Sequence, residues 1–316
     1  MKQIKNNLIY IILAVLLVIL LISTLYLLSF DPKEKNDPTQ EPQASVTAPA
    51  SPSASPTSVP SPSPTSRPVI PLGGLATKGQ EWSFGRWAHK KDENGIEQMI
   101  YELDPENVAV TGKYKAITGH KEGKTVYLTF DEGYENGYTP KILDVLKEKG
   151  IKAIFFLTGG FVDSDPELVK RMYREGHILG NHTENHPLMA DLSEEDFQKE
   201  LLTLEEKVNQ VLGFEYDMKY YRPPQGYFSE RDLALASNLG YTTVFWSFAY
   251  DDYSKPNESS DELIRKSYLK TIQSAHDGEV LLLHAVSKVN SIILGDVIDY
   301  YQEQGYTIAD LDQYNS

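Results

Sequence analysis

The chain has 316 residues, no cysteine and a formal net charge of −15. The lack of cysteine excludes a disulfide scaffold and thiolate metal ligands, so any bound metal would be held by imidazole and carboxylate groups. The acidic balance argues against nucleic-acid binding, which requires a basic surface. A neutral sugar polymer remains open as a substrate.

The first thirty residues have the composition of a membrane anchor. Residues 8–30 are almost wholly Leu, Ile, Val and Tyr, and a helix of that length measures about 35 Å, enough to cross a bilayer core of about 30 Å. Lys2 and Lys5 predict a cytoplasmic N-terminus and an exported remainder. A cleaved signal peptide is the alternative, but the apolar run is long for one and no small-residue cleavage site follows closely. We expect residues 1–30 to be a single-pass anchor in the cell membrane.

A linker rich in Pro, Ser and Thr is expected at residues 31–72. Residues 31–71 contain eleven of the chain's eighteen prolines, and such a segment buries too little apolar surface to offset the entropy of ordering it. As extended polyproline it would span up to about 120 Å. It would place the remaining residues, enough for a single large core, on the extracellular, wall side of the membrane.

Aromatic residues after the linker predict an N-terminal extension at 73–118, packed on the domain that follows at 119–316. From there, short β-branched and aromatic runs alternate with segments of helical period. The extension is indicated by Trp82, Phe84, Trp87 and Tyr101. Strands are expected at 125–130, 152–158, 177–181, 219–222, 242–248, 279–284 and 306–310. Helices are expected from Pro140 to Gly150, Asp165 to Gly176, Ser193 to Gly213 and Ser229 to Gly240, and at 260–275 and 289–304.

This alternation predicts an α/β fold of parallel strands joined by right-handed crossovers. Seven strand–helix units favour a barrel-like closure over an open sheet. In such folds the chemistry gathers at the carboxyl ends of the strands. Polar residues stand at five of these ends: Asp131 with Glu132, His182, Arg222, Asp252 and His284.

His182 and His186 are four residues apart in a loop that precedes Pro187, so both imidazoles can reach one divalent ion. The alternative is a hydrogen-bonded histidine pair. Asp131 and Glu132 can supply one base and one further ligand, and a solvated turn is their alternative. Together these residues are sufficient to activate water with a bound metal.

Arg222, followed by two prolines, is either a surface residue or the partner of a carboxylate at this rim. His284 ends an apolar strand and is either a buried structural histidine or a catalytic group. His177 begins a strand at the opposite rim and is expected to be structural. The remaining histidines, His89, His120 and His276, have no supporting context.

The ordered motifs resemble those of NodB-homology polysaccharide deacetylases over roughly residues 119–312. They are Thr129-Phe130-Asp131-Glu132-Gly133, His182 with His186, Arg222-Pro223-Pro224-Gln225-Gly226, Trp246 with Asp252, and Leu282-Leu283-His284. The segments 131–138 and 244–247 are most similar to the peptidoglycan N-acetylmuramic acid deacetylases, the enzymes of muramic δ-lactam formation. The extension at 82–85 also resembles that branch.

The resemblance implies a distorted (β/α)7 barrel and a role for each matching residue. Asp131 corresponds to the catalytic base, Arg222 to the residue that holds it, His284 to the general acid and Asp252 to the carboxylate that orients this acid. Glu132, His182 and His186 correspond to ligands of a divalent metal ion, Zn²⁺ or else Co²⁺ or Mn²⁺. Gln225, Leu282 and Trp246 correspond to substrate-binding positions, with the Gln225 backbone N–H at the oxyanion.

Three positions depart from the family pattern. Glu132 stands where Asp is usual, and its extra methylene moves the carboxylate. Gln225 stands where Tyr is common, and Tyr253 where Trp is common. The expected activity is metal-dependent N-deacetylation of N-acetylmuramic acid in peptidoglycan. The alternatives are an N-acetylglucosamine, chitin-type or xylan deacetylase and a non-catalytic glycan-binding homologue. The expected partners are the wall polymer and the membrane, with no nucleic acid and no obligate protein partner.

Overall fold

The computed structural model describes residues 69–83, 85–91, 97–119 and 121–314. The predicted anchor at 1–30 and all but the last residues of the predicted linker lie outside this part of the chain. Within the described ranges, no helix is long and apolar enough to cross a membrane.

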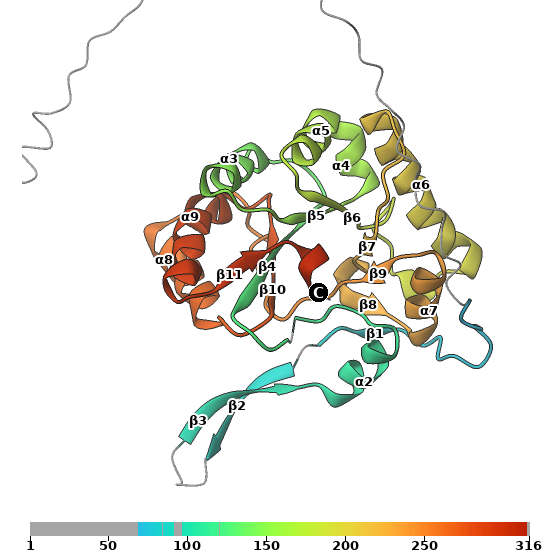
Figure 1. Cartoon of the computed structure of the whole chain (residues 1–316), viewed down its shortest axis with the longest axis horizontal. Helices are drawn as coiled ribbons and strands as arrows, with labels where there is room; N and C mark the ends of the chain where they lie inside the picture. Colours follow the sequence, from blue (N-terminus) through green and yellow to red (C-terminus); the bar gives the residue numbers. More distant parts are fainter. Residues whose placement is uncertain (1–68, 84, 92–96, 120, 315–316) are drawn as a thin grey trace, which may run out of the picture. The chain divides into compact units, whose positions relative to one another are not determined.

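Seven parallel strands form the central sheet (Figure 1). Their order is β10-β4-β5-β6-β7-β9, and β11 also pairs with β4. The parallel α/β arrangement predicted from the sequence is therefore confirmed. The strands are β4 (Thr125–Glu132), β5 (Ile154–Leu157), β6 (Ile178–Asn181), β7 (Tyr220–Tyr221), β9 (Thr242–Thr243), β10 (Glu279–His284) and β11 (Thr307–Ala309).

The strand expected at 242–248 is regular only at Thr242–Thr243, so its predicted length is wrong. Within the next five residues the backbone changes partner twice: Val244 bonds to Tyr221, Phe245 to Ile117, and Ser247 to Val280. No single neighbour runs alongside it, so no regular ladder forms. One isolated bridge joins Val244 to Ile117, and another, between Phe248 and Leu281, brings this segment back to β10. The barrel is thus distorted, with irregular backbone between β9 and β10.

The helices cover the sheet in the order expected. The caps match the sequence signals at several ends: the Ser193 hydroxyl accepts from Asp196 N at 3.1 Å, Ser229 and Asp232 form a capping box, and Gly213 ends its helix with φ of 82°. The helices are α3 (Thr139–Lys149), α4 (Gly159–Ser164), α5 (Pro166–Arg174), α6 (Glu194–Leu212), α7 (Glu230–Asn238), α8 (Asp261–Gln273) and α9 (Lys288–Glu303). The short α4 had no counterpart in the sequence prediction, and Asp165 makes no side-chain cap bond.

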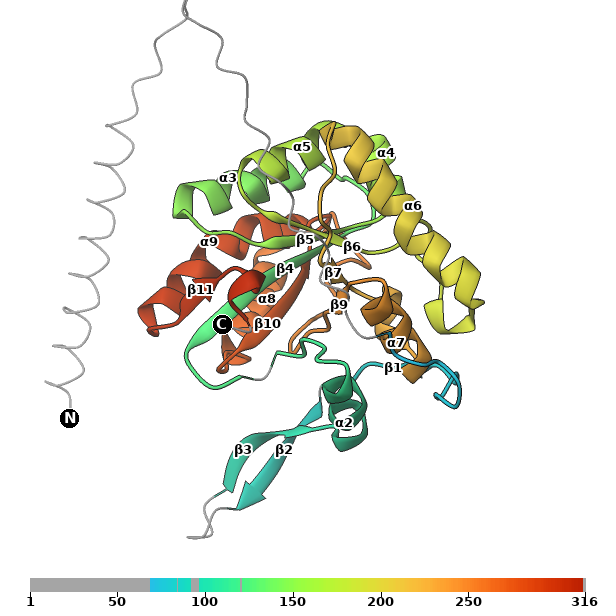
Figure 2. The same ribbon diagram turned by 45° about the vertical axis from the view of Figure 1, so that its right-hand side comes forward.

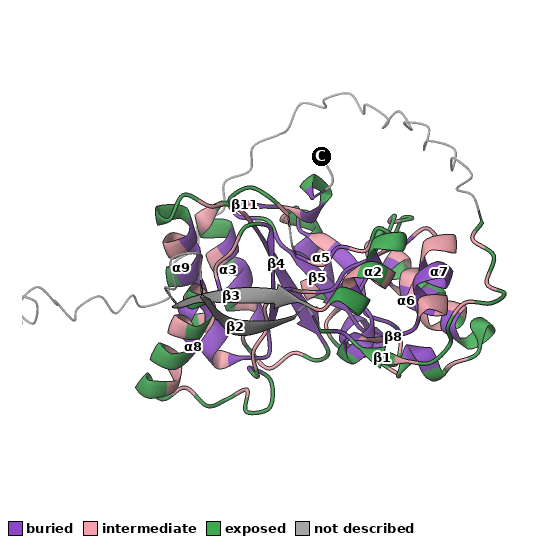
Figure 3. Ribbon diagram, turned by 90° about the horizontal axis from the view of Figure 1, so that it is seen from below, coloured by how far each residue is buried: buried purple, intermediate pink, exposed green. Residues whose placement is uncertain are grey.

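Alternation along β4 separates two buried clusters. Val126, Leu128 and Phe130 belong to the larger one, beneath the helices, whereas Tyr127 belongs to a smaller one inside the barrel. Figure 3 shows β4 and β5 as buried strands among partly exposed helices. The face of a strand on which a residue lies therefore decides whether it meets the helix layer or the barrel interior.

Residues before β4 form the N-terminal extension, seen again in Figure 2. The strand β1 (Gln80–Glu81) pairs antiparallel with β8 (Tyr227–Phe228), and β2 (Gly85–Lys91) pairs with β3 (Glu97–Leu103) ahead of α2 (Pro105–Lys113). Trp82 stacks on Phe245 with ring centroids 4.3 Å apart, and its indole N–H donates to Trp246 O at 2.8 Å. This contact places the extension against the loops after β7 and β9. Three short 3-10 helices, at Met189–Asp191, Pro224–Gly226 and Leu311–Gln313, complete the described elements.

Candidate active site

Strand register brings Asp131 and His284 together. The two residues are direct partners on the neighbouring parallel strands β4 and β10. Paired residues of a parallel sheet point to the same face, and Tyr127 of β4 shows that this face is the barrel interior. The predicted base and the predicted acid thus share one rim, at the carboxyl ends of adjacent strands.

Asp131 is buried against a buried arginine. Arg222 Nη1 lies 2.7 Å from Asp131 Oδ1, and the other guanidinium nitrogens donate to the carbonyls of Val244 and Phe245. Burial raises the pKa of Asp131, but the charge and the hydrogen bond of Arg222, together with the charge of His284, outweigh it and hold this pKa below its usual value. Asp131 is therefore an ionised carboxylate at neutral pH, as a base requires.

His182 and His186 converge beside Asp131. Their ring centroids are 4.9 Å apart, and His182 Nε2 lies 3.4 Å from Asp131 Oδ2. His182 Nδ1 lies 2.8 Å from Arg222 O, and this carbonyl can only accept, so Nδ1 carries the proton and Nε2 a lone pair. Burial lowers the pKa of His182 to about 4, so the ring is neutral at pH 7. A neutral imidazole with a free Nε2 lone pair suits a metal ligand.

The pKa of His284 is shifted in the opposite direction. Its Nδ1 lies 2.7 Å from Asp252 Oδ1, and its backbone N–H donates to Asp252 Oδ2 at 2.8 Å. Burial lowers the pKa of His284, but the hydrogen bond and charge of Asp252 outweigh it and raise this pKa above 6.5. With Nδ1–H directed at Asp252, Nε2 is the atom that can hold and release a proton.

Asn290 was missed by the sequence prediction. Its amide donates to Asp252 Oδ2 at 2.5 Å and to His284 O at 3.1 Å, and Tyr250 donates to its oxygen. Asn290 lies fully buried in the first turn of α9, where nothing in the sequence distinguishes it from a capping residue. Its contacts fix the carboxylate that orients His284.

Glu132 does not lie with the imidazole pair. It pairs with Leu157, a residue of the cluster beneath the helices, and consecutive strand residues point to opposite faces. Both of its oxygens are buried without a hydrogen-bond partner, and no group of three His, Asp or Glu residues arranged to hold a metal occurs in the described ranges. Burial and the neighbouring charges of Glu135, Asp131 and Asp165 raise its pKa well above 4.5. This placement argues against the ligand role that the resemblance assigned to Glu132.

The predicted substrate-binding residues surround the rim. Leu282 lies two residues before His284 on the same strand face, and is 4% exposed. Gln225 is exposed and adopts φ of 57°, directly after the two prolines that follow Arg222. Trp246 has its ring 5.7 Å from Arg222 Cζ. Tyr253, noted in the sequence only as a departure, is 56% exposed and lies 4.8 Å from the His284 ring, centroid to centroid.

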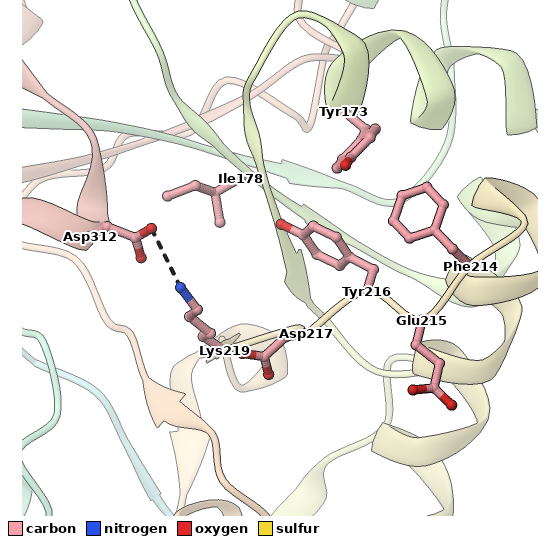
Figure 4. A pocket seen from close by; sticks show the side chains of 8 residues that line it. All are labelled: Tyr173, Ile178, Phe214, Glu215, Tyr216, Asp217, Lys219 and Asp312. Atoms are coloured by element: carbon pink, nitrogen blue, oxygen red, sulfur yellow. Dashed lines mark ion pairs between the residues drawn. The ribbon is translucent and has the colours of Figure 1, made fainter. Parts of the chain in front are cut away.

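A hollow of about 450 Å³ lies away from this rim, beside the amino-terminal ends of β6 and β7 (Figure 4). Tyr173 and Phe214 contribute exposed rings, and Lys219 pairs with Asp312 at 3.6 Å. None of its lining residues is a predicted site residue. His177, also at this end, accepts from Ala153 N at 3.2 Å, and its pKa is lowered to about 4 by burial, which is the structural environment expected of it.

Comparison with known proteins agrees with this geometry. The polysaccharide deacetylase family matches residues 118–244. The peptidoglycan-N-acetylmuramic acid deacetylase PdaA of Bacillus subtilis is 45% identical over 232 residues, covering 73% of this chain and 84% of that protein. The chain belongs to the polysaccharide deacetylase family. The family resemblance, and with it the prediction of a polysaccharide or peptidoglycan deacetylase, is confirmed.

Solved structures of the family show the same fold. PdaA of Bacillus subtilis, described as a family 4 carbohydrate esterase, superposes with a TM-score of 0.67 at 38% identity and covers 76% of this chain and 97% of its own. A peptidoglycan-N-acetylglucosamine deacetylase of Bacillus cereus is 35% identical over 54% of this chain and 59% of that protein. A family 4 pseudoenzyme from Bacillus anthracis shares the fold at 24% identity, with a TM-score of 0.57 over 62% of this chain and 67% of that one. The relatives thus agree on deacetylation, but their names give two different sugars, N-acetylmuramic acid and N-acetylglucosamine.

Proposed function

We propose that this polysaccharide deacetylase hydrolyses the N-acetyl group of N-acetylmuramic acid in peptidoglycan, with a divalent metal ion held by His182 and His186. The observation that carries the proposal is the pairing, across two adjacent strands, of an ionised Asp131 with a His284 whose pKa is raised above its ordinary value. The muramic sugar is supported by the 45% identity to a protein that bears this activity in its name.

The imidazole pair fits a divalent ion, and Glu132 does not complete it. His182 has its Nε2 lone pair available because Arg222 O fixes the tautomer, and His186 stands at the exposed side of the pair. Two imidazoles leave further positions for water and substrate. A bound divalent ion supplies Lewis acidity, lowering the pKa of water and polarising the acetamide carbonyl.

The chain's own residues move the protons. Asp131 takes a proton from the attacking water, and Arg222 keeps this carboxylate ionised before the step. The water oxygen first bonds to the carbonyl carbon, which moves the C=O electron pair onto oxygen; when this oxyanion collapses, the C–N bond breaks and His284 Nε2 gives its proton to the departing amine. Acetate and a free amino sugar result, with no covalent enzyme intermediate. By the family resemblance, the Gln225 backbone N–H faces the developing oxyanion.

Two alternatives share the same catalytic residues. An N-acetylglucosamine substrate is favoured by the 35% identical relative named for that sugar. A non-catalytic glycan-binding role is the second alternative, motivated by Glu132 in place of the usual Asp. The complete set of Asp131, His182, His186, Arg222 and His284 favours catalysis over binding alone.

We also propose that the apolar run at 8–30 anchors the protein in the cell membrane, with the catalytic domain on the wall side. Its length, the lysines before it and the proline-rich segment after it support this location.

The decisive experiment treats isolated peptidoglycan with the purified full chain and measures released acetate together with the masses of the digested glycan. We expect loss of acetyl groups from muramic residues, dependence on added Zn²⁺ or Co²⁺, and no loss with Asp131→Asn. Loss confined to glucosamine residues would replace the proposed substrate with the alternative one. Glycan binding without acetate release would favour the non-catalytic role.

A further inference from the structure

The loop that carries the imidazole pair is held in an unusual backbone conformation. Thr183 has φ of 70° and His186 has φ of 56°, although neither is glycine. A β-branched residue such as Thr183 rarely adopts positive φ, and such conformations persist only where the surroundings enforce them. The loop at 182–186 therefore needs external support to present its two rings.

One set of contacts fixes the turn locally. Thr183 N donates to Asn181 Oδ1 at 2.9 Å, and His186 N donates to Thr183 Oγ1 at 2.9 Å. The amide of Gly159, at the start of α4, donates to the carbonyls of Thr183 and Glu184. A Cβ on Gly159 would lie 2.7 Å from the backbone carbonyl oxygen of Glu184, so this close approach requires glycine.

A second set ties the loop to α6. The Glu200 carboxylate accepts from Asn185 N and from Asn185 Nδ2, both at 2.8 Å, and Glu184 N donates to Glu200 O at 3.1 Å. Lys207 Nζ lies 2.5 Å from Glu184 Oε1 and 2.6 Å from Asp163 Oδ2 of α4. Glu200 and Lys207 are two turns apart on one face of α6, and both bind residues that lie between the two histidines.

The groups that meet in these contacts are complementary in charge. Glu200 meets two N–H donors, while Lys207 meets two carboxylates, and charge-assisted bonds of this kind are stronger than neutral ones. The side chains of Lys207 and Glu184 are only 25% and 16% exposed, so solvent screens the pair incompletely. The contacts are therefore suited to holding a strained loop.

We propose that Glu200 and Lys207 are positioning residues for the imidazole pair: by binding Asn185 and Glu184, they hold the loop at 182–186 in the conformation in which His182 and His186 converge. The inference deepens the proposed function and rests on it for the metal that the two rings would bind. It assigns α6, which carries no predicted site residue, to the organisation of the site.

The test uses the full chain with Glu200→Gln and Lys207→Met. The matched controls are Glu206→Gln and Lys199→Met, which make the same charge changes at exposed positions of α6 and touch no residue of the loop. Titration with Co²⁺ or Zn²⁺ measures affinity. We expect Glu200→Gln and Lys207→Met each to bind the metal ion about 10–100-fold more weakly, the size typical of losses around a metal site. We expect the controls to bind as the wild type does.

Activity and rescue separate positioning from general destabilisation. We expect kcat at fixed metal to fall while KM stays unchanged, excess metal to restore part of kcat, and Lys207→Arg to retain most of the metal affinity because it keeps the charge. If both Glu200→Gln and Lys207→Met bound the metal ion as tightly as the wild type does, the proposal would be overturned.

Amide hydrogen exchange without metal gives an independent readout of the loop. We expect faster exchange of the amides at 183–186 in the Glu200 and Lys207 variants than in their controls. If the wild type bound no metal and released no acetate, the proposed function would fail, yet exchange would still decide whether α6 holds this loop. If amide exchange at 183–186 were also unchanged in the Glu200 and Lys207 variants, the inference would be wrong as well.

Discussion

Two histidines of the same rim have pKa values that are shifted in opposite directions. His182 is buried with a backbone carbonyl as the acceptor for its Nδ1, and burial lowers its pKa to about 4. His284 is paired with the carboxylate of Asp252, which raises its pKa above 6.5. At His182 burial favours the neutral ring even though the hydrogen bond to the Arg222 carbonyl raises the pKa, whereas at His284 the Asp252 carboxylate outweighs burial and favours the charged ring. The balance between burial and a hydrogen-bonded carboxylate thus distinguishes the proposed metal ligand from the proposed proton donor.

Removing the imidazole of His182 should have the largest effect on metal binding and activity. His182→Ala removes one of only two imidazoles that converge, so we expect metal affinity to fall by more than the roughly 100-fold upper range of losses around a metal site. Acetate release should disappear at ordinary metal concentrations. His177→Ala is the matched control, since it removes a buried histidine remote from the rim. Unchanged metal stoichiometry in His182→Ala would contradict the ligand role.

Removing the carboxylate charge beside His284 should shift the pH dependence of kcat/KM. Asp252→Asn removes the charge that raises the pKa of His284, so this pKa should fall. Because the acid must be protonated, the basic limb of the kcat/KM profile should move to lower pH by the same amount. Asp251→Asn, the same change at the exposed neighbouring residue, should leave the limb in place. An unmoved limb in Asp252→Asn would remove His284 from the acid role.

A buried carboxyl remote from the rim separates effects of pH on folding from effects on chemistry. Glu279, at the opposite end of β10 from His284, accepts from Ser274 and Tyr301, and burial raises its pKa to about 8. The folded state then binds the proton more tightly than the unfolded state does. Its contribution to stability is therefore complete below about pH 4.5 and is lost as pH rises toward 8.

In Glu279→Gln we expect this loss, of up to about 1.4 kcal/mol per pH unit, to disappear from the free energy of unfolding measured with denaturant. The exposed Glu303→Gln on α9 is the control. Parallel pH curves for Glu279→Gln and the wild type would show that Glu279 does not titrate in this range.

The smallest effect is expected at Glu132. It faces the helix layer, and burial raises its pKa well above 4.5, which favours the protonated form that glutamine closely matches. We expect Glu132→Gln to change Co²⁺ or Zn²⁺ affinity by less than about 10-fold, at or below the low end of losses from groups outside the ligand shell. A loss as large as that of His182→Ala would restore Glu132 as a ligand.

Strand ends and helix caps could be predicted from the sequence because they depend on neighbouring residues. The apolar run before Asp131, the run that ends at His284 and the capping serines of α6 and α7 each have a local cause, namely side-chain period and backbone hydrogen-bonding needs. The rim followed from these ends, because parallel strands end on the same side of a sheet. The resemblance then supplied the roles of its residues.

Other features depended on partners distant in the chain. Asn290 reaches Asp252 across 38 residues, and the backbone after Thr243 loses its strand character because its partners change from β7 to Ile117 to β10. The α6 contacts to the loop of the imidazole pair likewise join side chains that carry no distinguishing pattern of their own.

Glu132 illustrates the difference between what the sequence determines and what only the tertiary structure decides. The sequence by itself determined that a carboxylate pair ends β4 at the rim, because a buried apolar strand must stop where charged residues begin. Only the pairing of β4 with β5 decided that Asp131 enters the barrel while Glu132 turns to the helices. The physical reason is the two-residue period of the strand: it sends neighbouring side chains to opposite faces, and only the packed layers on each side decide which face is the site.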